Sequence, residues 1–119
     1  IPIKIENLSN IIKIDAYKNI SIALDKDGNV YIWGAGYTAT PTKLDFSQRV
    51  VSISGALILT ENGKVYNIAN LNTTIEGLYN IAKISCGETH NIALSTEGIA
   101  LTWGTNAYGE CGEYEANAI

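Results

Sequence analysis

The stretch SIALDKDGNVYIWG at residues 21–34 decides the fold, because the chain repeats its pattern twice more. It superposes without gaps on ALILTENGKVYNIA at 56–69 and on NIALSTEGIALTWG at 91–104. The three copies share one glycine, which recurs at equal intervals of 35 residues: Gly28, Gly63 and Gly98. A fixed period of this length is the signature of a repeat architecture.

Each copy has the pattern of a β-hairpin. Ile22 and Leu24 occupy every second position before the glycine, and Val30 and Ile32 do so after it. That alternation is typical of strands with one buried face. In all three copies the glycine follows an acidic or amide residue, where a tight hairpin turn needs a positive φ. The sequence therefore predicts an all-β fold of repeated antiparallel sheets.

The similarity extends upstream of the hairpins, because ENLSNIIKI at 6–14 aligns with EGLYNIAKI at 76–84. The middle copy is degenerate: its connection before the hairpin is four residues shorter, and it lacks the Trp-Gly pair. We expect a single repeat region over 1–119, with units at approximately 1–40, 41–75 and 76–119. A hairpin of this size cannot bury its own apolar face, so neighbouring units must stack.

The third copy, CGETHNIALSTEGIALTWGTNAYGECG at 86–112, resembles the repeat of the regulator of chromosome condensation family. Units of that family run Cys-Gly, His, Ala-Leu, acidic-Gly, Trp-Gly and Tyr-Gly-x-x-Gly. Residues 10–34 resemble the same unit well, and the middle copy resembles it weakly. The resemblance implies a β-propeller of about seven four-stranded blades that acts mainly as a protein-interaction platform. The spacing of 35 residues is shorter than the usual repeat of the family.

Three units cannot close a propeller ring, so we expect a partial β-propeller that belongs to a larger one. The open sheet edges of a partial propeller carry unpaired backbone groups, which invite pairing with another chain. Self-association through these edges is therefore a second expectation.

The composition excludes several classes of partner. The net charge is -4, and no window gathers Lys or Arg into the basic stripe that nucleic acid requires. No apolar run approaches the roughly 18 residues that a membrane-spanning helix needs. Cys86 and Cys111 lie 25 residues apart without a CxxC pair, which gives no zinc site and favours two free thiols. We expect no nucleic-acid or membrane partner, no cofactor and no bound metal.

Few residues could carry chemistry. His90 is the only histidine, but it occupies the histidine position of the repeat, where holding a turn is the favoured role. Cys86, four residues before it, does not form a spacing that requires a nucleophile and a base. Asp25 and Asp27 lie in an acidic turn that could offer oxygen ligands to calcium, but a calcium site usually needs more carboxylates, and turn formation is the favoured explanation. Without a paired carboxylate, a triad or a metal constellation, we expect no enzymatic activity.

The repeated residues and the connecting residues have different expected roles. The residues expected to be structural recur with the repeat or belong to its signature: Gly28, Gly63, Gly98, Trp33, Trp103 and His90. The connections vary while the hairpins repeat, and loop aromatics often anchor protein interfaces. The candidate partner-binding residues lie in these connections: Tyr37, Asn106, Tyr108 and Tyr114.

These observations favour a non-catalytic protein-interaction scaffold with a protein partner. The alternative is a regulator of an enzyme, acting either by guanine-nucleotide exchange on a small GTPase or as an inhibitor. The resemblance admits this alternative, but no residue of the sequence can be assigned to either form of it.

Overall fold

The structure is a computed structural model that describes residues 1–87 and 90–104. Within these ranges all regular structure is β, in ten strands that form three antiparallel sheets. The first sheet contains β1 (Ile11–Tyr17), β2 (Ile20–Asp25), β3 (Val30–Gly34) and β4 (Thr42–Lys43). The second contains β5 (Val50–Ser54), β6 (Leu57–Thr60) and β7 (Val65–Asn67), and the third contains β8 (Ile81–Cys86), β9 (Asn91–Ser95) and β10 (Ala100–Trp103). The prediction of an all-β repeat fold is confirmed.

The hairpins form where the glycines predict them. Gly28, Gly63 and Gly98 have φ values of 87°, 79° and 84°. A residue with a Cβ would be less stable in this backbone conformation by about 1 kcal/mol or more. Each glycine joins the second and third strands of its sheet, so that Leu24 pairs with Val30 across the first turn. The same register recurs in the other two sheets.

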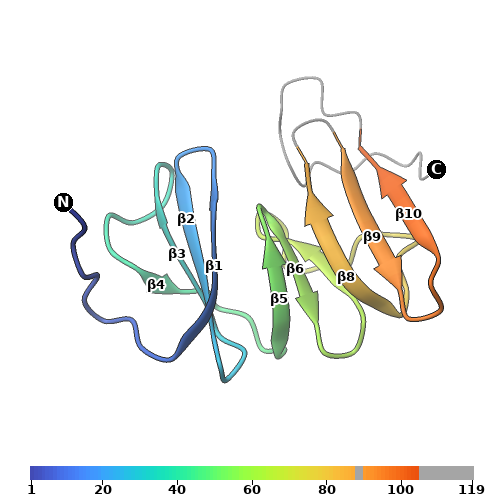
Figure 1. Ribbon diagram of the computed structural model, residues 1–119, viewed down its shortest axis with the longest axis horizontal. Helices are drawn as coiled ribbons and strands as arrows, with labels where there is room; N and C mark the ends of the chain where they lie inside the picture. Colours follow the sequence, from blue (N-terminus) through green and yellow to red (C-terminus); the bar gives the residue numbers. More distant parts are fainter. Residues whose placement is uncertain (88–89, 105–119) are drawn as a thin grey trace.

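The sheets lie side by side in chain order, as Figure 1 shows. A first hydrophobic core fills the space between the first and second sheets, and a second core fills the space between the second and third. The alternation of strand β6 divides its side chains between them: Ile58 belongs to the first core, and Leu57 and Leu59 belong to the second. The middle sheet is therefore buried on both faces, which is the stacking that a partial propeller requires.

The two tryptophans are placed differently although they share a repeat position. Trp103 is buried in the second core at 2% exposure. Trp33 is only half-buried, on the face of the first sheet that points away from the second. The difference arises because no sheet of the described chain covers that face of the first sheet.

The fourth strand of the first sheet follows the Pro41 connection. The N–H of Leu44 donates to the Val30 carbonyl oxygen at 2.7 Å, and the N–H of Ile75 donates to the equivalent Val65 oxygen at 2.8 Å. The chain before Ile75 thus runs beside β7 as the chain before Leu44 runs beside β3. None of the described residues forms a helix that could cross a membrane.

Candidate partner-binding surface

Of the four residues that the sequence suggests for partner binding, Tyr37 lies in the described chain. Asn106, Tyr108 and Tyr114 lie outside the described residues. Tyr37 belongs to the connection between β3 and β4, and 43% of its surface is exposed. The candidate surface is therefore built from this connection.

Tyr37 is presented by a tightly hydrogen-bonded turn. The N–H of Gly34 donates to the Thr38 carbonyl oxygen at 2.8 Å, and the N–H of Tyr37 donates to the Gly34 oxygen at 2.9 Å. Gly34 has a φ of 114° and lies so close to the Asn19 carbonyl that an added Cβ would clash with it. The N–H of Ala35 donates to that same carbonyl at 3.0 Å, which ties the turn to the β1–β2 connection.

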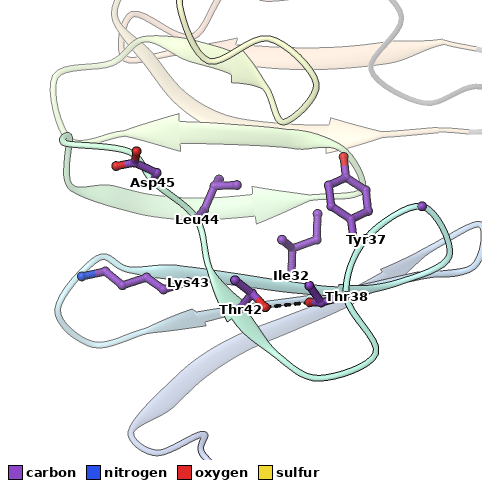
Figure 2. A pocket seen from close by; sticks show the side chains of 8 residues that line it. Ile32, Tyr37, Thr38, Thr42, Lys43, Leu44 and Asp45 are labelled. Carbon is purple, nitrogen blue, oxygen red and sulfur yellow. Dashed lines mark hydrogen bonds between the residues drawn. The ribbon is translucent and has the colours of Figure 1, made fainter.

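A hollow of about 270 Å³ lies beside Tyr37 (Figure 2). Its lining comes from β3, the connection and β4 with the residues that follow it: Ile32, Gly36, Tyr37, Thr38, Thr42, Lys43, Leu44 and Asp45. In Figure 2 the apolar side chains of Ile32 and Leu44 lie between Tyr37 and Asp45. Thr38 and Thr42 close one side through a contact of 2.6 Å between their hydroxyl oxygens.

The composition of the hollow suits a side chain of a protein partner. Ile32 and Leu44 supply apolar surface, Tyr37 supplies an aromatic ring with a hydroxyl group, and Lys43 and Asp45 supply one charge of each sign. A pocket for a drug-sized ligand usually measures at least about 300 Å³. An aromatic residue beside a small apolar hollow instead has the character of an interface anchor.

The sequence suggested Tyr37 as a partner-binding residue but did not suggest the residues that line the hollow with it. No sequence pattern pointed to a partner-binding role for Lys43, Leu44 or the two threonines, Thr38 and Thr42. The available signal was Pro41, which ends the connection and allows a short edge strand to return beside β3. That strand places Lys43 and Leu44 next to the Tyr37 turn.

The residues considered for acid–base or thiol chemistry do not assemble into a reactive group. Cys86 is disulfide-bonded, so the free thiol favoured by the sequence is wrong for this residue. Its sulfur is not available as a thiolate nucleophile in this state. His90 is exposed, and its carbonyl oxygen accepts a hydrogen bond from the N–H of Gly87 at 2.9 Å.

The acidic turn at Asp25 is closed by its own backbone. Oδ1 of Asp25 accepts hydrogen bonds from the N–H groups of Asp27 and Asn29, both at 2.9 Å. Oδ2 accepts from Nδ2 of Asn29 at 3.2 Å and from the Tyr31 hydroxyl at 3.3 Å. Burial raises the pKa of Asp25, but these donors together outweigh it and hold the pKa below its ordinary value. Burial and the neighbouring Asp25 carboxylate raise the pKa of Tyr31.

The Asp25 carboxylate therefore stabilises the hairpin turn, and both of its oxygens already accept hydrogen bonds from the protein. Across 1–87 and 90–104, no cluster of three or more His, Cys, Asp or Glu side chains could hold a metal ion.

Comparison with known proteins identifies the repeat. The regulator of chromosome condensation (RCC1) repeat model matches residues 11–37 and 81–110. Protein pim1 of Schizosaccharomyces pombe is 34% identical over 97 residues, which are 82% of this chain and 16% of pim1. Guanine nucleotide exchange factor SRM1 of Saccharomyces cerevisiae is 26% identical over 106 residues, which are 89% of this chain and 18% of SRM1.

Comparison with solved structures agrees with the sequence matches. The solved structure of Prp20p from Saccharomyces cerevisiae superposes with a TM-score of 0.69 and 25% identity, over 89% of this chain and 34% of that one. The chain thus spans about a third of this structure and less than a fifth of pim1 and SRM1. The matched segments contain the first and third hairpins, and the sheets stack as a partial propeller. In these two units, the chain contains repeats of the regulator of chromosome condensation family.

Proposed function

We propose that this chain is a non-catalytic protein-interaction scaffold that binds a protein partner through the Tyr37 hollow, the surface made by Tyr37 and the residues that line the hollow with it. The observation that carries this proposal is the largely apolar hollow beside the hydrogen-bonded Gly34–Thr38 turn. The stacked sheets supply a rigid base, and a rigid base lowers the entropic cost of binding. Protein binding by a relative supports the proposal, since the Prp20p structure was described together with its binding to Gsp1p and histones.

The test is affinity purification from the source organism with the immobilised chain, compared between wild type and Tyr37→Ala. Because anchor residues commonly contribute about 2 kcal/mol or more, recovery of direct partners should fall about tenfold or further. Tyr79→Ala is the matched control, because Tyr79 is 60% exposed and does not line the hollow. Equal recovery with both variants would contradict the assignment of Tyr37.

A second candidate function is regulation of an enzyme by guanine-nucleotide exchange on a small GTPase. The similarity to SRM1, a guanine nucleotide exchange factor, favours it. Release of a fluorescent GDP analogue from small GTPases of the source organism would test this activity. Unchanged release at saturating amounts of the chain would exclude exchange and leave the scaffold proposal intact.

A further inference from the structure

Each sheet has two faces, and each face can pack against a different neighbouring sheet. We call the face that points toward the preceding sheet the upstream face, and the face that points toward the following sheet the downstream face. The downstream face of the first sheet contributes Ile22 and Leu24 to the first core. The upstream face of the third sheet contributes Ala93 and Trp103 to the second core. Within residues 1–87 and 90–104, two faces have no sheet packed against them, one at each end of the row (Figure 1).

The downstream face of the third sheet repeats a face that is buried elsewhere. Ile92 and Leu94 are equivalent, at an interval of 35 residues, to Leu57 and Leu59 of the middle sheet. Leu57 and Leu59 are 0% and 2% exposed against the third sheet, whereas Ile92 is 39% exposed. The downstream face of the third sheet thus has the apolar residues of an inter-sheet contact, but no sheet of the described chain packs against it.

The upstream face of the first sheet repeats the complementary surface. Ile14 is equivalent to Ile53 of the middle sheet and to Ile84 of the third. Ile53 is fully buried in the first core, and Ile84 packs against the second, but Ile14 is 74% exposed. Trp33, the equivalent of the buried Trp103, lies on the same open face.

Polar contacts between sheets recur in register as well. The Gly28 carbonyl oxygen accepts a hydrogen bond from the N–H of Val50 at 3.2 Å, and the Gly63 oxygen accepts one from Ile81 at 3.0 Å. In each case the hairpin glycine of one sheet bonds the first residue of the next sheet. Gly98 occupies this position in the third sheet, and a Cβ added to it would meet only open space.

A second recurring contact joins successive sheets near the C-terminal ends of their first strands. Oδ2 of Asp15 accepts a hydrogen bond from the N–H of Gly55 at 2.6 Å, and Oγ of Ser54 accepts one from the N–H of Cys86 at 2.9 Å. The exposed Ser85 holds the equivalent position in the third sheet. The equivalent donor is the N–H of Ala16, which bonds the neighbouring Asp15 side chain at 2.8 Å in this structure.

We propose that the downstream face of the third sheet binds the upstream face of the first sheet in a second copy of this chain. In this contact Ile92 and Leu94 pack against Ile14 and Trp33, as Leu57 and Leu59 pack against their equivalents within one chain. The Gly98 oxygen and the Ser85 hydroxyl accept hydrogen bonds from the N–H groups of residues 11 and 16 of the second copy. The interface is head-to-tail, so it continues the stack of sheets instead of pairing two like surfaces.

The test uses the full 119-residue chain, its Ile14→Lys and Ile92→Lys variants, and native mass spectrometry with light scattering. Wild type should form species of at least twice 12.8 kDa. Each variant alone should associate at least about tenfold more weakly, because a lysine would be buried in the apolar contact. A mixture of the two variants should give a 1:1 complex, because each retains the face that the other has lost.

Val51→Lys is the matched control, since Val51 is 45% exposed on the middle sheet, whose two faces are already covered. Ala16→Lys and Ala100→Lys, at exposed positions on the same two faces, form a second pair in case either first variant fails to fold. A monomeric wild type would overturn the proposal. So would a mixture that forms no complex, or a single variant that associates as wild type does, which would indicate contact between like faces.

Discussion

One position in each hairpin holds a buried polar side chain that closes the turn. This position recurs at intervals of 35 residues, and it is occupied by Asp25, Thr60 and Ser95 in the three units. Oγ of Ser95 accepts hydrogen bonds from the N–H groups of Glu97 and Ile99 at 3.2 and 3.1 Å, as the Asp25 carboxylate does from its own turn. The shared role is hidden in the sequence because three different residue types perform it. All three offer an oxygen acceptor, which is the property that the turn requires.

Replacing Asp25 with alanine should leave the turn N–H groups of Asp27 and Asn29 without their acceptor. Because Asp25 is only 6% exposed, we expect the free energy of unfolding to fall by about 1–3 kcal/mol. Urea denaturation followed by circular dichroism measures this change. Asp27→Ala serves as the control, since Asp27 contributes its backbone N–H to the turn and its side chain is exposed. An equal loss in both variants would refute the role of the Asp25 carboxylate.

The lowered pKa of Asp25 predicts an acid-sensitive contribution to stability. A carboxyl group with a lower pKa in the folded state binds its proton more readily when unfolded, so acidification favours unfolding. The contribution is complete above the ordinary value of 3.8 and is lost as the pH falls from there through the folded pKa. Thermal unfolding of wild type and Asp25→Asn between pH 7 and pH 3 tests it. The two melting temperatures should converge toward pH 3, and a constant difference would contradict the prediction.

At the scale of the element, the hairpins were predictable because their determinants are local. A glycine with positive φ and alternating apolar residues are both visible within 14 residues, as in SIALDKDGNVYIWG. Strand β4 could not be predicted from Pro41 alone, because Thr42 and Lys43 form a two-residue edge strand that depends on the return of the chain beside β3. For the same reason Tyr37 could be proposed from its loop position, whereas the hollow beside it could not.

The alternating apolar residues of the strands also did not reveal which face of each strand a neighbouring sheet would cover. Leu24 and Leu94 are equivalent in sequence, and truncation of either is expected to be destabilising. In the structure Leu24 is fully buried in the first core, whereas Leu94 is half-buried on the downstream face of the third sheet. Burial therefore depends on the neighbouring sheet and not on the strand itself.

Leu24→Ala should lower the free energy of unfolding by about 2–5 kcal/mol, the usual range for a buried leucine. Leu94→Ala should cost less than half as much when measured at a concentration where the chain is monomeric, because part of its surface is already in water. Chemical denaturation at matched dilution compares them. Equal losses would show that the downstream face of the third sheet is covered within a single chain.

At the scale of the whole molecule, the middle sheet connects the two cores. Repeat proteins gain much of their stability from the interfaces between neighbouring units. Val50, Ile53 and Ile58 face the first sheet, and Leu57, Leu59 and Val65 face the third. The most degenerate unit in sequence is thus the one whose sheet packs against both neighbours.

This arrangement predicts that damage to one core spreads to the other. Leu57→Ala removes contacts in the second core only, yet it should weaken the middle sheet that supports β2 as well. Native-state hydrogen exchange with mass spectrometry should show the opening free energy falling by about 2–5 kcal/mol in peptides from β2, β6 and β9 together. Ile92→Ala, at an exposed position of β9 outside both cores, is the control, and at a concentration where the chain is monomeric it should leave the protection of β2 unchanged. Loss of protection in Leu57→Ala confined to β6 and β9 would mean that the first two sheets are stable without the third, so that the cores unfold independently.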